Sequence, residues 1–127
     1  MNPFVADLRD WPILRMRSPT SDVHIESFFS IIDDALSREA VFVSIHDTRG
    51  MPNLNAVQRR KFADYIQRRE EPLGRWIAAH AVIVGSAIER GIVTAVLWLK
   101  PAPFPVKVFS TPQEAETWAI AKLRAAQ

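Results

Sequence analysis

The chain of 127 residues contains no cysteine. This absence excludes a disulfide scaffold, a zinc site with thiolate ligands and a cysteine nucleophile. Only four glycines are present, and they do not form a glycine-rich loop of the kind that cradles phosphate groups. The three histidines, His24, His46 and His80, lack the spacing of a metal-binding motif. The sequence therefore predicts neither a metal nor another cofactor, and it contains no complete catalytic set.

A long hydrophobic run is also missing. Residues 81–99 are rich in apolar side chains, but glycine, serine and charged residues interrupt them, and the uninterrupted part, Gly91–Leu99, has nine residues. A membrane-spanning helix needs roughly 20 apolar residues, so we expect no membrane insertion. Residues 1–19 lack the apolar core of a secretory signal, and we expect a cytoplasmic protein.

Charge of one sign is not in large excess, because 16 Lys and Arg residues face 14 Asp and Glu residues. The distribution is uneven: residues 1–50 carry five cations and eight anions, whereas residues 51–75 carry six and three. This basic segment includes Arg59 and Arg60, but acidic residues interrupt it. We therefore expect a solvated helix face and no nucleic-acid partner.

Hydrophobic residues make up 48% of the chain, which is typical of one globular domain, here residues 1–127. Their spacing predicts strands at Phe4–Asp10, Ile13–Arg17, Ala40–Ile45, Ala78–Val84 and Val106–Phe109. It predicts helices over about 25–36, 53–70 and 86–99, and a last helix that starts after Thr111. The order β-β-α-β-α-β-α-β-α predicts an α/β fold with a mostly parallel central sheet, an antiparallel edge strand and flanking helices.

Local signals predict where the helices begin and end. Asp22 or Ser21 is expected to cap the first helix, and Pro72 and Gly74 to end the second. Two segments match the capping box, in which the cap side chain and a glutamate three residues later each bond the other's backbone N–H. These two boxes are Ser86–Glu89 and Thr111–Glu114.

The element order and three segments resemble the STAS-like family, which includes bacterial anti-sigma-factor antagonists and SpoIIAA-like domains. The segments are Val41–Ile45 leading into Asp47-Thr48-Arg49-Gly50, Val82–Val84 leading to Ser86, and Val106–Phe109 leading to Thr111. The resemblance implies a single STAS-like domain with a protein partner at the loop after the third strand. In the family this loop is typically Asp-Ser-Ser-Gly, and its second serine can be phosphorylated. Arg49 stands at that position here, and Thr48 matches the first serine.

The loop Asp47–Gly50 is the candidate partner-binding site. It follows a buried strand, and open α/β sheets collect ligands at the carboxyl ends of parallel strands. We therefore predict a non-enzymatic protein–protein interaction or regulatory module. The residues expected to contact the partner or to steer it electrostatically are Asp47, Thr48, Arg49, Gly50, Arg59 and Arg60.

The stretch Ile92–Phe109 is unusually apolar, and this leaves three possibilities open. Its side chains could complete the core, form a homodimer interface, or line a groove for a small lipid-like ligand. The last possibility is the first alternative function, a protein that binds a small hydrophobic ligand. The histidines His46 and His80 fall in predicted strands that could be neighbours, where they would form a polar pair in the sheet.

A weaker alternative is a degenerate receiver-like signalling domain. Asp47 precedes Met51-Pro52, and Lys100-Pro101 lies downstream, as in receiver domains. A receiver also needs an acidic pair after its first strand to hold Mg²⁺, whereas Asp7 and Asp10 lie in a predicted hairpin. We therefore expect no phosphoryl transfer to Asp47.

Overall fold

The computed structural model describes all residues from Met1 to Gln127. It contains a five-stranded sheet with the order β2-β3-β5-β6-β7 and a separate two-stranded ribbon of β1 and β4. The strands are β1 (Asn2–Pro3), β2 (Val5–Asp7), β3 (Ile13–Arg17), β4 (Val23–His24), β5 (Phe42–Asp47), β6 (Ile77–Ile83) and β7 (Val106–Phe109). The helices are α1 (Ile25–Leu36), α2 (Ala56–Arg68), α3 (Glu70–Trp76), α4 (Ala87–Leu99) and α5 (Pro112–Ala126).

The main sheet is parallel except at one edge. β2 pairs antiparallel with β3, whereas the pairs β3–β5, β5–β6 and β6–β7 are parallel. The predicted α/β fold, with its mostly parallel sheet and antiparallel edge strand, is therefore confirmed. The structure adds the short β1–β4 ribbon and helix α3 to the predicted order.

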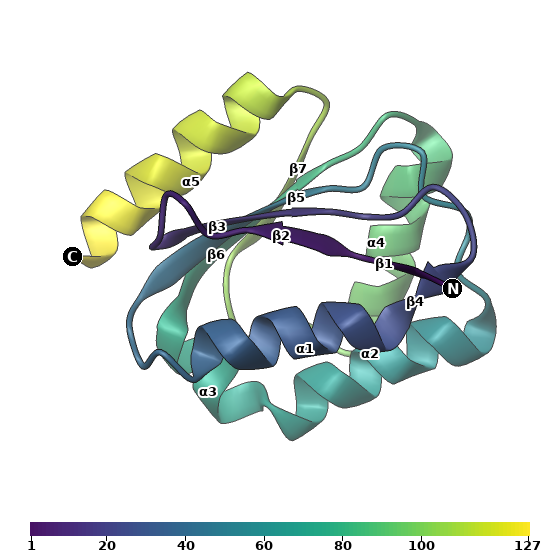
Figure 1. The fold of residues 1–127 in the computed structure, drawn as a ribbon, viewed down its shortest axis with the longest axis horizontal. Coiled ribbons are helices and arrows are strands. Elements are labelled where there is room, and N and C mark those ends of the chain that lie inside the picture. The colour runs from purple at the N-terminus through teal and green to yellow at the C-terminus, as the bar shows by residue number, and fades with distance from the viewer.

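The helices cover the two faces of the sheet unequally. Helix α5 lies alone on one side, and α1, α2, α3 and α4 lie on the other (Figure 1). Val43 and Ile45 of β5 pack in the same buried cluster as Ala115 and Ala119 of α5, whereas Phe42 belongs to the cluster on the opposite face. This alternation follows from the two-residue period of a strand, and it explains why both faces of β5 are buried.

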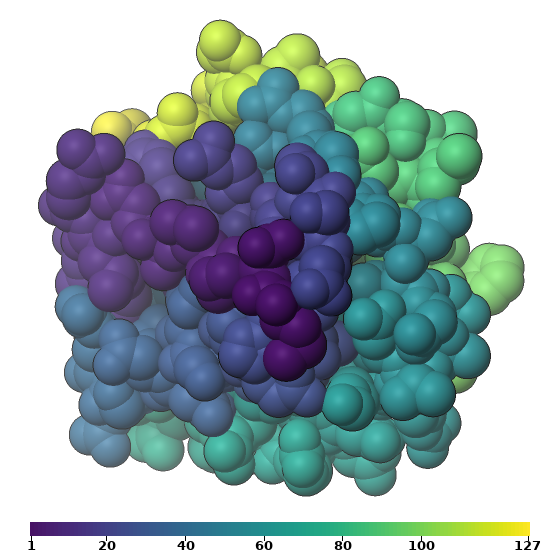
Figure 2. Space-filling view, turned by 45° about the vertical axis from the view of Figure 1, so that its right-hand side comes forward, coloured from purple at the N-terminus to yellow at the C-terminus, as the bar shows by residue number.

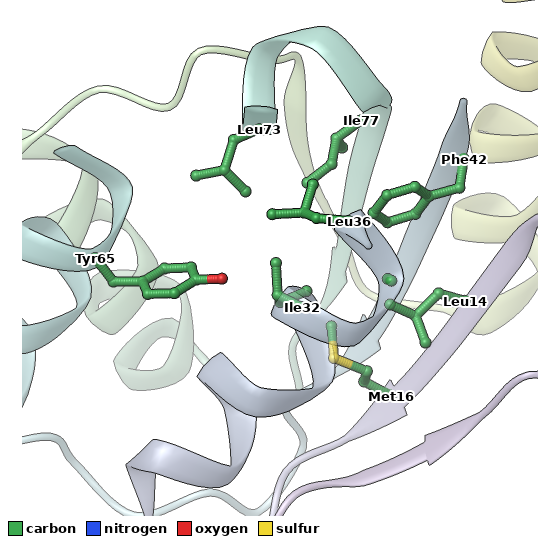
Figure 3. Close-up of a cluster of buried hydrophobic side chains, with 9 residues drawn as sticks. Leu14, Met16, Ile32, Leu36, Phe42, Tyr65, Leu73 and Ile77 are labelled. Carbon is green, nitrogen blue, oxygen red and sulfur yellow. The ribbon is translucent and has the colours of Figure 1, made fainter. Parts of the chain in front are cut away.

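The opposite cluster joins several elements to the sheet. Figure 3 shows Tyr65 of α2 pointing toward Ile32 of α1, with Leu73 of α3 above, Met16 of β3 below and Leu14 of β3 on the far side of Ile32. The ring of Tyr65 also stacks on that of Phe29, with centroids 4.5 Å apart. These contacts fix α1, α2 and α3 against one half of the sheet.

The N-terminal residues lie on the surface of the segment that follows β3 (Figure 2). Asn2 Nδ2 donates a hydrogen bond to the Ser21 carbonyl at 2.7 Å, and the Met1 amino group lies 3.1 Å from the Asp22 carboxylate. The prediction that Asp22 or Ser21 caps α1 was therefore wrong. Strand β4 intervenes, and the cap position is His24, which makes no side-chain cap bond.

The end of α2 also differs from the prediction. The helix stops at Arg68, and α3 follows at once and contains both Pro72 and Gly74. Pro72 is tolerated because it lies in the first turn of α3, where backbone N–H groups have no partner within the helix. A Cβ at Gly74 would lie 3.2 Å from the Pro103 carbonyl oxygen, so glycine allows this close approach.

Only half of each predicted capping box is present. Ser86 Oγ accepts from the Glu89 N–H at 3.2 Å, and Thr111 Oγ1 accepts from the Glu114 N–H at 3.3 Å. The return bonds differ: the Glu89 carboxylate accepts from the Gly85 N–H, and the Glu114 carboxylate accepts from the Thr111 hydroxyl. The complete capping box is at the start of α2, where Asn55 and Gln58 bond each other's backbone.

Candidate functional site

The loop Asp47–Gly50 lies at the carboxyl end of β5, as predicted. The Arg49 guanidinium donates to the Asp47 carboxylate at 2.9 and 2.7 Å, and the Arg49 N–H donates at 3.0 Å. Partial burial acts to raise the pKa of the Asp47 carboxyl, but the bonds from Arg49 outweigh it, and this pKa lies below its usual value. The charges of Asp47 and Arg49 are thus balanced within the loop.

Thr48 is enclosed by the protein. Its hydroxyl donates to the Ile83 carbonyl at 2.7 Å, its N–H donates to the same oxygen at 2.9 Å, and 3% of the residue is exposed. A kinase could reach this hydroxyl only after the loop had opened. In the described conformation Thr48 ties the end of β5 to the end of β6.

Gly50 and Glu89 connect the loop to α4. Gly50 has φ 84°, in the left-handed region that favours glycine. Its N–H donates to Glu89 Oε2 at 3.3 Å, while the Gly85 N–H donates to Glu89 Oε1 at 2.9 Å. Because Glu89 lies in the first turn of α4, the loop helps to hold that helix in place.

Arg59 and Arg60 lie near the start of α2. Arg59 Nη1 donates to the Leu54 carbonyl, and Arg60 Nε lies 3.2 Å from the Asp64 carboxylate. Neither side chain makes a hydrogen bond or ion pair with residues 47–50. The proposed steering by these two residues stays a prediction.

The acidic residues of the receiver alternative do not surround Asp47. Asp7 pairs with Arg9 at 2.8 Å, and Asp10 pairs with Arg15. Asp10 precedes β3 at the amino end of the parallel strands, whereas Asp47 lies at their carboxyl end. No acidic pair is therefore assembled beside Asp47 for a Mg²⁺ ion.

A cavity of about 120 Å³ lies between the sheet and the helices α1, α2 and α4. Helix α4 packs mainly against α2 rather than against the sheet, which leaves space above β6 and β7. Of the 20 lining residues, 17 are hydrophobic, so the cavity favours apolar atoms. The lining residues are Phe28, Ile32, His46, Thr48, Met51, Leu54, Phe62, Tyr65, Ile66, Leu73, Ile77, His80, Val82, Ile92, Val93, Val96, Leu97, Ala102, Phe104 and Val106.

Two histidine–serine pairs lie on the sheet beneath the cavity. His46 Nε2 lies 2.7 Å from Ser18 Oγ, and His80 Nδ1 is hydrogen-bonded to Ser44 Oγ. The histidines come from the neighbouring strands β5 and β6, and their ring centroids are 5.9 Å apart. The structure therefore places the two histidines together, as the sequence suggested.

Both histidines are neutral near pH 7. Burial lowers the pKa of His46 from 6.5 to about 3, with a smaller contribution from His80. Burial alone lowers the pKa of His80 from 6.5 to about 4. Each ring therefore carries one proton and can both donate and accept a hydrogen bond.

The histidine–serine pairs do not have the arrangement of a hydrolase. Ser44 is fully enclosed and Ser18 nearly so, so a substrate carbonyl cannot approach either hydroxyl. No carboxylate orients either ring, whereas a catalytic triad uses one to hold the histidine. The pairs supply hydrogen-bonding capacity to the cavity but not an activated nucleophile.

The other polar side chains at the cavity are already bonded within the protein. Thr48 donates to Ile83, and the Tyr65 hydroxyl donates to Asp33 Oδ1 at 2.6 Å. Burial, with a further contribution from Asp33, raises the pKa of Tyr65. This leaves the ring nitrogens of His46 and His80 as the polar atoms available to a bound molecule.

The apolar stretch Ile92–Phe109 has two distinct surfaces. Its inner side chains, including Ile92 and Val96, line the cavity. On the outer surface of α4, Trp98 is 84% exposed and Leu99 is also exposed, as is Ile88 at the start of the helix before this stretch. One part of the stretch therefore lines the cavity, and another presents large apolar groups to solvent.

Comparison of the chain with protein-family models, with curated proteins and with solved structures finds no match. No helix in the structure is both long enough and apolar enough to cross a membrane.

Sequence reasoning did not identify the cavity or the serine partners of the histidines. A usable signal was present in the strand pattern, because Ser44 and His46 occupy alternate positions of an otherwise apolar strand. Alternate residues face the same side of a sheet. The cavity itself depends on how far α4 stands from the sheet, which no local pattern encodes.

Proposed function

We propose that this protein is a non-enzymatic binding domain whose cavity takes a small, mainly apolar molecule. The observation that carries the proposal is the apolar cavity between α4 and the sheet, with two neutral histidines beneath it. Ligand sites in proteins are commonly concave and apolar with a few polar groups that orient the ligand.

The size of the cavity limits the ligand. Its volume of about 120 Å³ is similar to that of engineered cavities of about 150 Å³ that bind benzene. A single ring or a short branched chain fits this space, whereas a long acyl chain does not. The aromatic side chains of Phe28, Phe62 and Phe104 in the lining favour a ring through edge and stacking contacts.

The test is ligand binding followed by protein NMR and thermal unfolding, with ethylbenzene as the probe. We expect saturable shifts of the Val82 and Ile92 amide signals and a higher melting temperature, because ligand binds only the folded state. Val96→Phe should fill the cavity and abolish the shifts. Ala95→Phe puts the same side chain on the adjacent position, which does not line the cavity, and should retain them.

The outcomes separate cleanly. If ethylbenzene and other ring-sized apolar probes leave the amide spectrum unchanged, the protein does not use the cavity for binding and the proposal fails. If Val96→Phe and Ala95→Phe lose binding equally, the ligand does not occupy the cavity described here. Circular dichroism of both variants establishes that they are folded.

The second candidate function is the STAS-like protein-interaction module, located in the cytoplasm, that the sequence predicts. It is supported by the exposed apolar side chains Ile88, Trp98 and Leu99 on α4, a feature typical of protein interfaces. Self-association through Ile92–Phe109 is its simplest form. Sedimentation velocity should show a dimer that Trp98→Glu converts to monomer, while Asp47→Ala and Arg49→Ala test the loop. A monomer at all concentrations would exclude self-association.

A further inference from the structure

We infer that the ligand of the cavity carries a carbonyl oxygen, which accepts hydrogen bonds from the ring N–H groups of His46 and His80. This inference rests on the proposed ligand-binding function and names the chemical class of the ligand. It follows from the positions of the two rings, from the proton each ring carries and from the charges that the cavity lacks.

The rings of His46 and His80 lie on the same face of the sheet. The register pairs Ser44 with His80 on neighbouring strands, and His46 lies two residues after Ser44, so all three side chains share one face of the sheet. That face is the one beneath the cavity, since both histidines line it. Ser44 therefore contacts the His80 ring from within the sheet, and Ser18 contacts the His46 ring from the residue after β3. Helix α4 lies on the opposite side of the cavity.

One nitrogen of each ring has no hydrogen-bonding partner in the protein. Ser18 bonds His46 Nε2 and Ser44 bonds His80 Nδ1, which leaves His46 Nδ1 and His80 Nε2. The protein contains no side-chain nitrogen or oxygen that is both fully enclosed and unpaired. Each remaining nitrogen is therefore reached from open space, and the open space beside these residues is the cavity.

The hydrogen bonds of the two serines determine which nitrogen of each ring carries the proton. Each serine hydroxyl has the histidine nitrogen as its single side-chain partner, and both serines are buried. A hydroxyl proton without an acceptor in such a place would cost about 1–3 kcal/mol. Both hydroxyls therefore donate to the rings. Since each ring is neutral and holds one proton, His46 carries it on Nδ1 and His80 on Nε2.

The two N–H donors and the lack of cationic side chains in the lining define the chemical class of the ligand. Two N–H donors facing an apolar cavity need an acceptor, and an apolar hydrocarbon provides none. The cavity lining contains no lysine or arginine, so nothing there would balance the charge of a carboxylate, which is costly to bury alone. A neutral carbonyl oxygen meets the donors without a buried charge, and it can accept one bond or two.

The first experiment measures the tautomers directly in the protein without ligand. Long-range ¹⁵N–¹H NMR spectra should show His46 protonated at Nδ1 and His80 protonated at Nε2, both neutral at pH 7. The opposite tautomer at both rings, or a charged ring, would overturn the inference. This measurement needs no variant.

The second experiment compares three probes of similar size: ethylbenzene, acetophenone and benzoate. We expect acetophenone to bind at least about fivefold more tightly than ethylbenzene, since one neutral hydrogen bond contributes about 1 kcal/mol, and benzoate to bind most weakly. The variant Ser44→Ala/His80→Phe removes one donor together with its partner. It should reduce the ratio of the acetophenone affinity to the ethylbenzene affinity.

The results distinguish this inference from the function on which it rests. If ethylbenzene and acetophenone bind equally, the cavity binds apolar molecules but the histidines do not select a carbonyl. If benzoate binds best, the ligand is an acid and the inference is wrong. If no probe binds, the proposed function itself fails. Should the double variant not fold, the tautomers and the probe series in the wild-type protein still decide.

Discussion

The two faces of the central sheet are packed in different ways, although the same strands form both. On the α5 face, Ala79 and Ala81 of the sheet meet Ala115 and Ala119 of the helix, and all four are completely buried. These small side chains let α5 lie directly on the strands. On the opposite face, larger side chains surround a cavity and two histidine–serine pairs.

The difference separates stability from binding. A close-packed face gains dispersion contacts from every buried atom, whereas a cavity lacks those contacts along its lining. Buried imidazoles also require hydrogen bonds that an alkyl side chain would not need. The α4 face is therefore packed less closely than the α5 face, as the proposed ligand site requires. Four changes test this contrast between the two faces.

The largest effect is expected from pH, because the buried titratable rings lie on the cavity face alone. The pKa values of His46 and His80 are about 3 and about 4 in the folded protein, against 6.5 for the ordinary group. Below pH 6.5 the unfolded chain takes up protons that the folded protein does not. Each histidine should then reduce the unfolding free energy by up to about 1.4 kcal/mol per pH unit, until its folded pKa is reached.

Urea unfolding at pH 7, 6 and 5 measures this loss. The carboxyl groups of Asp33 and Asp47, whose pKa values are lowered from 3.8, titrate below this range. The double variant Ser44→Ala/His80→Phe should show about half the pH dependence. Equal stability of the wild-type protein at pH 7 and pH 5 would mean that the rings are not buried and neutral.

A matched pair of truncations tests packing next. Leu123→Ala, on the α5 face, should lower the unfolding free energy by about 2–3 kcal/mol, since it creates a cavity in a filled region. Leu97→Ala, on α4, should cost less than about 1 kcal/mol because its side chain is partly exposed and already adjoins a cavity. Equal losses in urea unfolding would remove the contrast between the faces.

The reverse change adds volume to each face. Ala119→Leu should destabilise by about 1–3 kcal/mol, because the strands leave no space at this position. Val96→Phe should be tolerated within about 1 kcal/mol, since the added atoms can enter the cavity. Thermal unfolding of both variants makes the comparison, and a stable Ala119→Leu protein would show that α5 can move away from the sheet.

The smallest effect is expected in the loop beside the cavity. Arg49→Ala should lower the unfolding free energy by less than about 1 kcal/mol, since its ion pair with Asp47 is partly exposed to solvent. Thr48→Val, which removes the enclosed bond to Ile83, should cost more, about 1 kcal/mol or above. Chemical unfolding measures both losses. A larger loss for Arg49→Ala than for Thr48→Val would mean that the exposed ion pair stabilises the loop more than the enclosed hydrogen bond does.

The sequence was sufficient to predict the main sheet and its flanking helices because the strands are mainly apolar or alternate regularly, and the helices have regular apolar stripes. It was insufficient where one local signal competes with another. Pro72 and Gly74 resemble a helix end, yet they fit into α3 because the first turn accepts proline and a neighbouring loop needs the space at Gly74. Asp22 resembles a cap, yet the Met1 amino group occupies its carboxylate.

The candidate site was only partly predictable for a similar reason. The loop Asp47–Gly50 could be located from the end of a strand, but the pairing of Asp47 with Arg49 and the burial of Thr48 depend on tertiary contacts. The alternation in β5 indicated which residues share a face with His46. It could not indicate that Ser18, from a separate segment, would hold that ring.

The weak attachment of α4 has a kinetic consequence. Ile92 is the one buried residue among the 13 of this helix, so α4 contributes few side chains to the core. Local opening of this helix requires less free energy than global unfolding. Amide hydrogens of α4 should exchange with solvent far faster than those of α5.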